Sequence, residues 1–493
     1  MINKKNQCTT TRRQAIKILV AGFGASMLPD VKALNVGSKE TTHANAFSET
    51  TKSLEEIQFP MKFDFGNGTA AAGYKKVSAG TIYSKTVGYG FEPDADGVEI
   101  KEVKRNNEIL RGDYVTASPL FKFSVSAPQG NYKVAVTFGD AADESSTTVK
   151  AETRRLIIEN VTTAKGQFET RTFYVNVRDR SLSPGNAVKL DVREWDPATD
   201  LPVTFTWDDK LTLQFSGANP CVCAVEIEPV EDAITLFLCG DSTVTDQASE
   251  PNGTWGQQLQ RWFDLPVVVS NHAESGQTLK AFRFQRRWDK VMEMMKEGDY
   301  VFMQFGHNDL NRGGHDAMWP VEDKAGDWIN THSEANTDYV WLLASYAVEI
   351  KRRGGIPVIV SPMTKMNRTT GLVNVEGMGD YPKGAAEAAK LAQCDFIDLF
   401  AMSVEIVKGL GTELSPQAYT DGLHSSSYGG YLFTRCIVEG VKKAGLGIVQ
   451  YITKDAGTFD PSNPKPLPAD FKIPVDPRIP VPTPPGMQRR TNT

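Results

Sequence analysis

The stretch ITLFLCGDST, residues 234–243, decides how the second half of this 493-residue chain folds. Its first six residues are almost all apolar and do not alternate with polar ones, which is typical of a strand buried on both faces of a parallel sheet. The run then ends in a short polar turn that contains a glycine. Similar apolar runs follow over residues 267–270, 300–305, 357–361 and 396–399.

Helical segments separate these runs. The clearest spans residues 339–353, with Thr337 as a candidate N-cap and Gly354-Gly355 as its stop. Buried strands that alternate with helices build a doubly wound α/β domain. We therefore predict a flavodoxin-like parallel sheet, with helices on both faces, over residues 231–455.

Residues 59–230 follow a different period. Their short apolar runs alternate with polar residues, and Gly, Asn, Asp and Pro interrupt them every 8–12 residues or so. No convincing helical period occurs between them. This pattern predicts an all-β sandwich of the jelly-roll type. The clearest runs are 61–65, 120–125, 132–138, 172–177 and 211–215.

The first 33 residues have the features of an export signal. A positive segment with the pair Arg12-Arg13 precedes an apolar stretch over residues 18–28, and small residues around Ala33 suit signal peptidase. We expect export across a bacterial inner membrane, to the periplasm or the exterior, with residues 34–58 as a linker. The alternative is an amphipathic N-terminal helix of the mature fold.

The C-terminal tail, residues 456–493, is rich in proline. Ten of the 27 prolines fall within the last 33 residues, and proline lacks the amide donor that helices and central strands need. The tail is therefore either an extended strap on the body or a disordered spacer, and the composition does not decide between them.

Composition excludes several classes of protein. Hydrophobic residues make up 40% and charged residues 23%, and the net charge is -6 with no long basic tract, so we expect no nucleic-acid partner. Beyond residue 30 no apolar run is long enough to insert into a membrane. The six cysteines form no CxxC pair, and no HxxxH pair, phosphate loop or nucleotide fingerprint occurs. We therefore predict buried cysteines, no metal and no cofactor.

Four polar, glycine-containing loops follow the strands of the predicted sheet. Ligands bind outside the carboxyl ends of the strands in such sheets, so we expect these loops to meet at one site. The loops are 240–243, 270–276, 306–309 and, before the last helix, 419–424.

The residue types in these loops suit acyl transfer. Ser242 can act as a nucleophile if His424 accepts its proton and Asp421 orients the imidazole. The amides of Ser242 and Gly276 and the side chain of Asn308 can donate to an oxyanion. Each residue alone is more often a cap, a turn or a structural residue. Their order on successive strand ends is what predicts an active hydrolase.

At these residues the chain resembles the SGNH (GDSL-type) hydrolase superfamily over residues 234–450. The matching blocks are GDST, the glycine of AESG, GHND and DGLH. Within the superfamily the chain looks most like the rhamnogalacturonan acetylesterases, on the blocks GDSTV and GHND, the Trp255-Gly256 step and the Asn271-x-Ala273-x-x-Gly276 pattern. The resemblance implies Ser242, Asp421 and His424 as the triad, and Gly276 and Asn308 as the oxyanion-hole pair. Family members often have Gly-Arg-Ser in the second block, whereas this chain has Gly276-Gln277-Thr278, which bears on recognition of an acidic uronate sugar.

The β-domain resembles the galactose-binding-like jelly rolls of pectin-active enzymes. Residues 63–66 at its start and 224–229 at its end carry this likeness. It either holds polysaccharide near the esterase or packs as an accessory domain that shapes one wall of the cleft. Tyr83, Tyr89 and Phe91 are candidate sugar platforms, with core packing as the alternative.

Three further residues are candidates for substrate binding. Arg312 and Trp319 lie in an insertion, about residues 311–336, that can form a substrate wall, and Arg312 can pair with a uronate carboxylate. His307 precedes Asn308 in the third block, with a structural hydrogen-bonded role as its alternative.

Together these observations predict a secreted, metal-independent carbohydrate O-acetylesterase that acts on acetylated rhamnogalacturonan of pectin. Competing interpretations are an esterase for acetylated xylan or another glycan, and a lipid esterase. A protein of a different class, an inactive polysaccharide-binding protein, has no reason to retain all five residues.

Overall fold

The computed structural model describes residues 58–93, 98–311, 318–320, 328–474 and 476. The predicted export signal and nearly all of the predicted linker lie outside these residues. Within the described part of the chain, no helix is long and apolar enough to cross a membrane.

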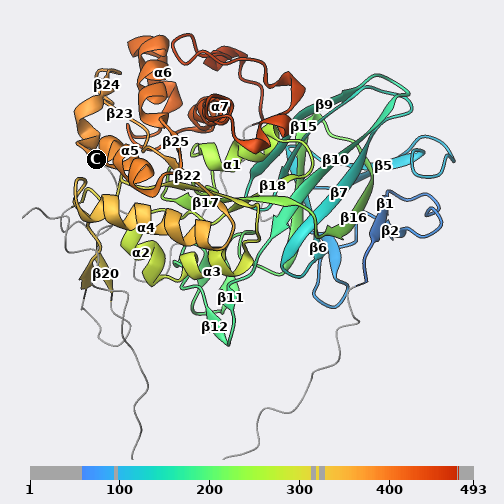
Figure 1. Cartoon of the computed structure of the whole chain (residues 1–493). Coiled ribbons are helices and arrows are strands. Elements are labelled where there is room, and N and C mark those ends of the chain that lie inside the picture. The colour runs from blue at the N-terminus through green and yellow to red at the C-terminus, as the bar shows by residue number, and fades with distance from the viewer. Residues whose placement is uncertain (1–57, 94–97, 312–317, 321–327, 475, 477–493) are drawn as a thin grey trace, which may run out of the picture. The chain divides into compact units, whose positions relative to one another are not determined.

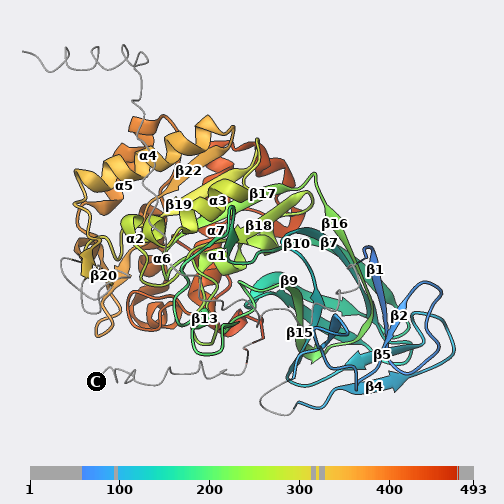
Figure 2. The same cartoon turned by 90° about the horizontal axis from the view of Figure 1, so that it is seen from below.

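The N-terminal part is a two-sheet β-sandwich, as its period predicts (Figures 1 and 2). The first sheet has the order β10-β7-β16-β1-β2, with β5 between β16 and β4, and the second has the order β3-β6-β15-β8-β9. The strands of the first sheet are β1 (Met61–Phe65), β2 (Lys75–Val77), β4 (Lys101–Lys104), β5 (Asp113–Thr116), β7 (Gly130–Gly139), β10 (Phe168–Val177) and β16 (Val222–Val230). Those of the second are β3 (Tyr89–Phe91), β6 (Leu120–Ser126), β8 (Ser145–Ala151), β9 (Arg155–Thr163) and β15 (Lys210–Asn219).

Alternate residues of each strand fill the space between the two sheets. In β7 every second residue from Tyr132 to Phe138 is at most 3% exposed, because successive side chains of a strand point to opposite faces. Phe91 is fully buried and packs edge-on against Phe123 at 5.8 Å. The prediction of Phe91 as a sugar platform is therefore wrong. Tyr89 packs on Phe63 at 5.0 Å, in the same aromatic core.

The C-terminal part is a doubly wound α/β domain, which confirms the predicted fold class. Its five strands are all parallel, in the order β18-β17-β19-β22-β25, which is the 2-1-3-4-5 order of flavodoxin-like folds. The strands are β17 (Ile234–Gly240), β18 (Val267–Asn271), β19 (Tyr300–Gln304), β22 (Ile356–Val360) and β25 (Asp395–Ile397).

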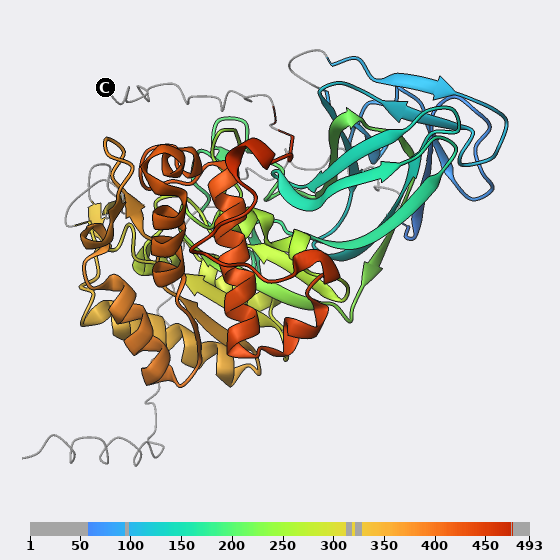
Figure 3. The ribbon, with the colours of Figure 1, turned by 90° about the horizontal axis from the view of Figure 1, so that it is seen from above.

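Helices cover both faces of this sheet. The cluster on one face includes residues of α1 (Trp255–Gln258), α6 (Leu399–Leu414) and α7 (Ser427–Ala444), and Figure 3 shows α6 and α7, in orange and red, in front of the sheet. The other face packs against α2 (Leu279–Phe284), α3 (Arg287–Met294), α4 (Asp338–Arg352) and α5 (Tyr381–Ala392). The helix predicted over 339–353 is α4, one residue earlier at each end.

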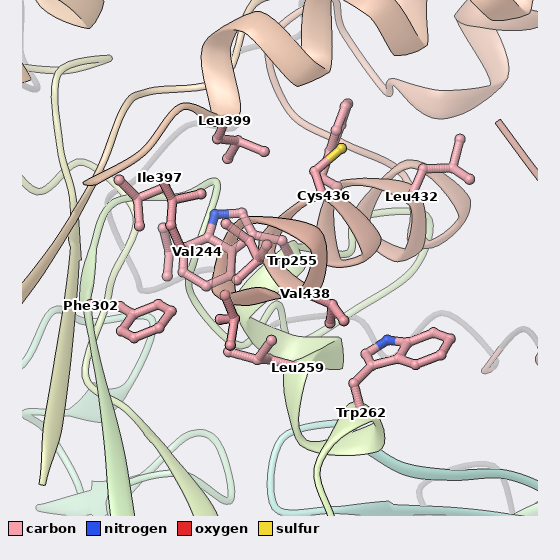
Figure 4. Packing of buried hydrophobic residues seen from close by; sticks show 14 of the residues in the cluster. Val244, Trp255, Leu259, Trp262, Phe302, Ile397, Leu399, Leu432, Cys436 and Val438 are labelled. Carbon is pink, nitrogen blue, oxygen red and sulfur yellow. The ribbon is translucent and has the colours of Figure 1, made fainter. Parts of the chain in front are cut away.

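Because both faces of the sheet are covered, the apolar residues of its strands do not alternate with polar ones. Leu236 and Leu238 of β17 belong to the cluster under α7, whereas Phe237 and Cys239 belong to the cluster under α4. Trp255 lies at the centre of the first cluster, among side chains of the sheet and of α7 (Figure 4). Its indole Nε1 donates to Gln304 Oε1 over 2.7 Å. Because α1 follows the loop after β17, which carries Ser242, this packing holds that loop against the sheet.

A long connection between β10 and β15 packs on the α/β domain. It contains the hairpins β11 (Ser181–Leu182) to β12 (Asn186–Ala187) and β13 (Trp195–Asp196) to β14 (Leu201–Pro202). Its Glu194 accepts from Trp207 Nε1 over 2.7 Å and is paired with Arg287 at the start of α3. Arg178 donates to the carbonyl of Asn271 at the end of β18. The connection therefore reaches the edge of the sheet where the polar loops lie.

The described part of the C-terminal tail is a strap on the body. Its Asp476 is 3% exposed and accepts hydrogen bonds from Lys150 (2.7 Å), Arg154 (2.8 Å) and Gln214 (2.8 Å) of the β-domain. Tyr428 of α7 donates to the carbonyl of Pro466 over 3.0 Å. The composition left two alternatives open, an extended strap and a disordered spacer, and this part of the tail is a strap.

A buried ion pair joins the β-domain to the loop after β17. We expect its loss to destabilise the fold. Arg155 Nη2 lies 2.8 Å from Asp246 Oδ2, and both side chains are at most 2% exposed. We expect Arg155→Met to lower the free energy of unfolding by about 3–5 kcal/mol, because the substitution leaves a buried carboxylate without its counter-ion. Denaturant-induced unfolding measures the effect.

The matched control is Arg171→Met in β10, whose ion pair with Glu169 is formed by side chains that are 51% and 38% exposed. Exposed pairs contribute about 0–1 kcal/mol, so this variant should unfold nearly as the parent does. Equal effects of the two substitutions would contradict the structural role of the Arg155–Asp246 pair.

Candidate active site

The loop after β17 presents Ser242 on a tight turn. Asp241 Oδ1 accepts hydrogen bonds from the amide and the hydroxyl of Thr243 (3.0 and 2.8 Å), and the Asp241 carbonyl accepts from the amide of Val244 over 3.0 Å. Gly240 is required before this turn because a Cβ there would lie 2.7 Å from the carbonyl oxygen of Gln304. The strand end thus turns sharply and leaves the Ser242 side chain at the edge of the sheet.

Ser242, His424 and Asp421 form a continuous hydrogen-bonded series. Ser242 Oγ lies 2.9 Å from His424 Nε2, and His424 Nδ1 lies 2.6 Å from Asp421 Oδ2. The other carboxylate oxygen, Asp421 Oδ1, accepts from the amides of Leu423 (2.9 Å) and His424 (2.8 Å). The structure therefore brings together the three residues that the sequence predicts as nucleophile, base and orienting acid.

Asp421 is a carboxylate at neutral pH. Partial burial opposes its ionisation, but the hydrogen bond and charge of His424 and the two backbone amides outweigh burial and lower its pKa to about 2. A carboxylate at this position accepts the Nδ1 proton of His424, so Nε2 is the unprotonated nitrogen, which faces Ser242 Oγ.

The backbone amides of Ser242 and Gly276 are the two that the sequence predicts as oxyanion donors. Within the described residues, the amides of Ser242 and Gly276 have no hydrogen-bond acceptor. Gly276 has φ +81°, a conformation that suits glycine. The loops that carry these amides are joined, since the amide of Glu274 donates to the Gly240 carbonyl over 3.2 Å.

Asn308 follows β19 in the third loop. It is 6% exposed, and its side-chain amide donates to the carbonyl of Gln277 over 3.2 Å, one residue beyond Gly276. Its NH₂ group has a second N–H available to a ligand. Asn308 is therefore tied to the Gly276 loop, as a shared oxyanion site requires.

His307 supports the nucleophile loop and is not available to a substrate. It is 2% exposed, with Nδ1 3.2 Å from Asp241 Oδ2 and Nε2 3.0 Å from the carbonyl of Met363. Both ring nitrogens are thus used inside the protein, in place of the predicted substrate contact. This contact lowers the pKa of Asp241 against the opposing effect of its burial.

The other two candidates lie in the insertion after β19. Arg312 is outside the described residues. Trp319 is in β20 (Met318–Pro320), where its backbone pairs with Ile329 of β21 (Trp328–Asn330). Neither observation tests the predicted substrate-binding roles.

No pattern in the sequence indicates a contact from the β-domain to the site. Arg193 Nη2 donates to the carbonyl of Ser275 over 2.9 Å, next to Gly276, across a separation of 82 residues. Gln247 Nε2 donates to the carbonyl of Ser242 over 2.8 Å. Neither residue lies in a recognisable motif, so only the folded chain reveals them.

No metal ligand cluster is present among the residues that the structure describes. The cysteines in these residues are all free, and four of the five are buried: Cys223 and Cys239 in strands, Cys436 in a helix, and Cys221 directly before β16. Burial raises the pKa of Cys221 to about 12, which keeps this thiol protonated and unreactive.

The hydrogen-bonded series of Ser242, His424 and Asp421 lies at the carboxyl edge of the doubly wound sheet, where such folds bind their ligands. The comparisons with known proteins make the class specific. Residues 238–430 match the model of the "GDSL-like Lipase/Acylhydrolase family", and residues 61–184 match that of the "Beta-agarase/YXIM esterase-like, galactose-binding domain-like" family.

Curated relatives agree with these matches. The chain is 26% identical over 402 residues to "uncharacterized esterase YxiM" of Bacillus subtilis (strain 168), which covers 78% of this chain and 91% of that protein. It is 25% identical over 241 residues to rhamnogalacturonan acetylesterase RhgT of the same strain, covering 45% and 96%. The crystal structure of YxiM from Bacillus subtilis aligns with a TM-score of 0.40 and 22% identity, covering 78% of this chain and 99% of that one.

The predicted resemblance is confirmed. The chain has an SGNH (GDSL-like) hydrolase domain behind a galactose-binding-like β-domain, and it is a carboxylic ester hydrolase.

Proposed function

We propose that this protein is an exported carbohydrate esterase that removes acetyl groups from acetylated rhamnogalacturonan. The observation that carries the mechanism is the series Ser242–His424–Asp421, with contacts of 2.9 and 2.6 Å. The acetyl-polysaccharide substrate is supported by the rhamnogalacturonan acetylesterases among the relatives. Export is supported by the twin-arginine and apolar segments at the N-terminus.

In the acylation step, Ser242 Oγ attacks the acetyl carbonyl while its proton passes to His424 Nε2. The negative charge on the carbonyl oxygen is stabilised by the amides of Ser242 and Gly276 and by Asn308 Nδ2. Each such donor contributes about 3–4 kcal/mol to the barrier reduction. The tetrahedral intermediate collapses, and the sugar oxygen leaves with the proton from His424.

In the deacylation step, water attacks the acetyl-serine. His424 Nε2 accepts a proton from this water, and the same oxyanion donors stabilise the second intermediate. Collapse releases acetate, and the proton returns to Ser242 Oγ. Asp421 stays ionised throughout because its pKa is about 2, and it stabilises the imidazolium formed in both steps.

The substrate is tested by acetate release from acetylated rhamnogalacturonan and from acetylated xylan at matched acetyl concentration. We expect kcat/KM to be at least about tenfold higher on the pectic polymer, a difference of about 1.4 kcal/mol in transition-state binding. Release from xylan alone would retain the mechanism and overturn the substrate. No release from either polymer would overturn the proposed function.

A further inference from the structure

Lys365 is a half-buried lysine without a counter-ion at the carboxyl edge of the parallel sheet. It begins β23 (Lys365–Met366), which follows β22 and pairs with β24 (Val373–Asn374). Among the described residues, its Nζ has neither a hydrogen-bond acceptor nor an ion-pair partner. Nζ nevertheless keeps a solvent-accessible surface, so a ligand can reach it.

The residues on both sides of Lys365 are tied to two loops of the candidate active site. The carbonyl oxygen of Met363 lies 3.0 Å from His307 Nε2, in the loop after β19. The amide of Met366 donates to the carbonyl of Gly422 over 2.8 Å, in the loop that carries the triad's acid and base. Lys365 therefore lies between these two loops and is held there by the backbone.

The side chain of Lys365 is directed away from the hydrophobic core. Successive side chains of a strand point to opposite faces, and the neighbouring Met366 is 4% exposed, in the cluster under α6 and α7. The stem of Lys365 passes Gly377, where an added Cβ would lie 3.1 Å from Lys365 Cδ. Burial lowers the pKa of Lys365, and the charge of Asp241 opposes this effect. The ammonium is thus on the side of the turn that carries the nucleophile.

The two acids of this edge are already engaged and do not neutralise Lys365. Asp241 Oδ2 lies 3.2 Å from His307 Nδ1, and Asp421 Oδ2 lies 2.6 Å from His424 Nδ1. A partly desolvated ammonium gains more from a carboxylate than an exposed one does, because less water screens the two charges. Lys365 is therefore available to an anionic group of a ligand.

We propose that Lys365 is a specificity residue that binds the carboxylate of an acidic sugar unit next to the acetylated unit. The proposal rests on the proposed function in that the substrate is a glycan ester, and it adds the charge of that substrate. Rhamnogalacturonan carries such carboxylates on its galacturonate units, whereas the xylose backbone of xylan is neutral. The second block of the site supplies no cation, since its Gln277 is neutral and 1% exposed.

The first test compares Lys365→Met with the parent on an acetylated rhamnogalacturonan oligosaccharide and on the same oligosaccharide with its uronates methyl-esterified. Methionine keeps an unbranched stem beside Gly377 and removes the charge. We expect kcat/KM for the free acid to fall about tenfold, as the loss of a hydrogen bond to a charged group predicts, with kcat/KM for the methyl ester unchanged. Lys365→Arg, which restores a cation, should recover most of the preference for the free acid.

The matched control is Lys443→Met, which makes the same change at an exposed lysine in the last turn of α7. This lysine is roughly 24 Å along the helix from Ser427, where α7 leaves the site. The control should keep the parent's ratio of the two kcat/KM values. An equal loss on both oligosaccharides in Lys365→Met would show that Lys365 only positions the Asp241 turn and would overturn the proposal. An unchanged ratio, or the same fall in the control, would also overturn it.

The second test measures binding and does not depend on esterase activity. Calorimetric titration of Ser242→Ala uses a deacetylated rhamnogalacturonan oligosaccharide and, separately, the same oligosaccharide with its carboxyl groups reduced to alcohols. Adding Lys365→Met should weaken binding of the acidic form about tenfold and leave the reduced form unaffected. No binding of the acidic form, or equal binding by both proteins, would overturn the proposal. Absence of acetate release by the parent would refute the proposed function, while this titration would still decide the role of Lys365.

Discussion

Replacing Ser242 with alanine is expected to lower kcat for acetate release by about 10⁴-fold or more, the range found when a nucleophilic serine is removed from a catalytic triad. Ser242 Oγ is the atom that His424 Nε2 contacts, at 2.9 Å, so no covalent intermediate can form without it. Stopped assays with acetylated rhamnogalacturonan and with p-nitrophenyl acetate measure the loss.

Folding and substrate binding should survive this substitution, because alanine removes one hydroxyl and leaves the Asp241 turn intact. Ser345→Ala is a matched control, since Ser345 is exposed on α4 and its hydroxyl donates to the carbonyl of Leu342 over 2.7 Å. The control should retain the activity of the parent. A Ser242→Ala variant that keeps more than about 1% of the parent rate would exclude Ser242 as the nucleophile.

The fold could be predicted because each of the two patterns of apolar residues, alternating and uninterrupted, has one physical cause. In β7, alternate burial follows from a sheet with one face in the core, as at Val134 and Val136. In β17, Leu236 and Phe237 are both buried because helices cover both faces of the sheet. The period alone does not say which aromatic residue is exposed, so it left Phe91 with two alternatives, a sugar platform and core packing, of which the second is correct.

The triad could be predicted because topology and local spacing determine it. A parallel sheet brings its strand ends to one edge, and Asp421 and His424 are three residues apart in one loop, close enough to hydrogen-bond. The residues that hold the loops of this site in place come from parts of the sequence far from those loops. Arg193 lies in an irregular connection of another domain, and no period or spacing relates it to Gly276. Only the packing of that connection, through pairs such as Glu194–Arg287, places it beside the site.

The residues proposed for the chemical steps all lie in the α/β domain, in the loops after β17, β18 and β19 and in the loop before α7. The connection between β10 and β15 contacts one of these loops through Arg193, which donates to the carbonyl of Ser275 over 2.9 Å.

Replacing Asp421 with asparagine is expected to lower kcat by about 10⁴-fold at neutral pH, by changing the tautomer of His424. Asp421 Oδ1 accepts two backbone amides, so an asparagine would place its carbonyl oxygen there. Its NH₂ group would then face His424 Nδ1, where Oδ2 now lies at 2.6 Å. Two donors cannot share this contact, so the imidazole proton would move to Nε2, which could no longer accept the proton of Ser242.

The matched control is Asp196→Asn, which makes the same change at an aspartate that also accepts a backbone amide in a turn, from Ala198 over 2.9 Å, and is remote from His424 in the sequence. It should keep the parent activity within about twofold. The initial rates of both variants are compared on p-nitrophenyl acetate, whose chemistry is independent of sugar binding. Because the loop's two amide contacts remain available to asparagine, Asp421→Asn should fold as the parent does. A loss smaller than about tenfold would show that Asp421 acts as a turn residue and that another group orients His424.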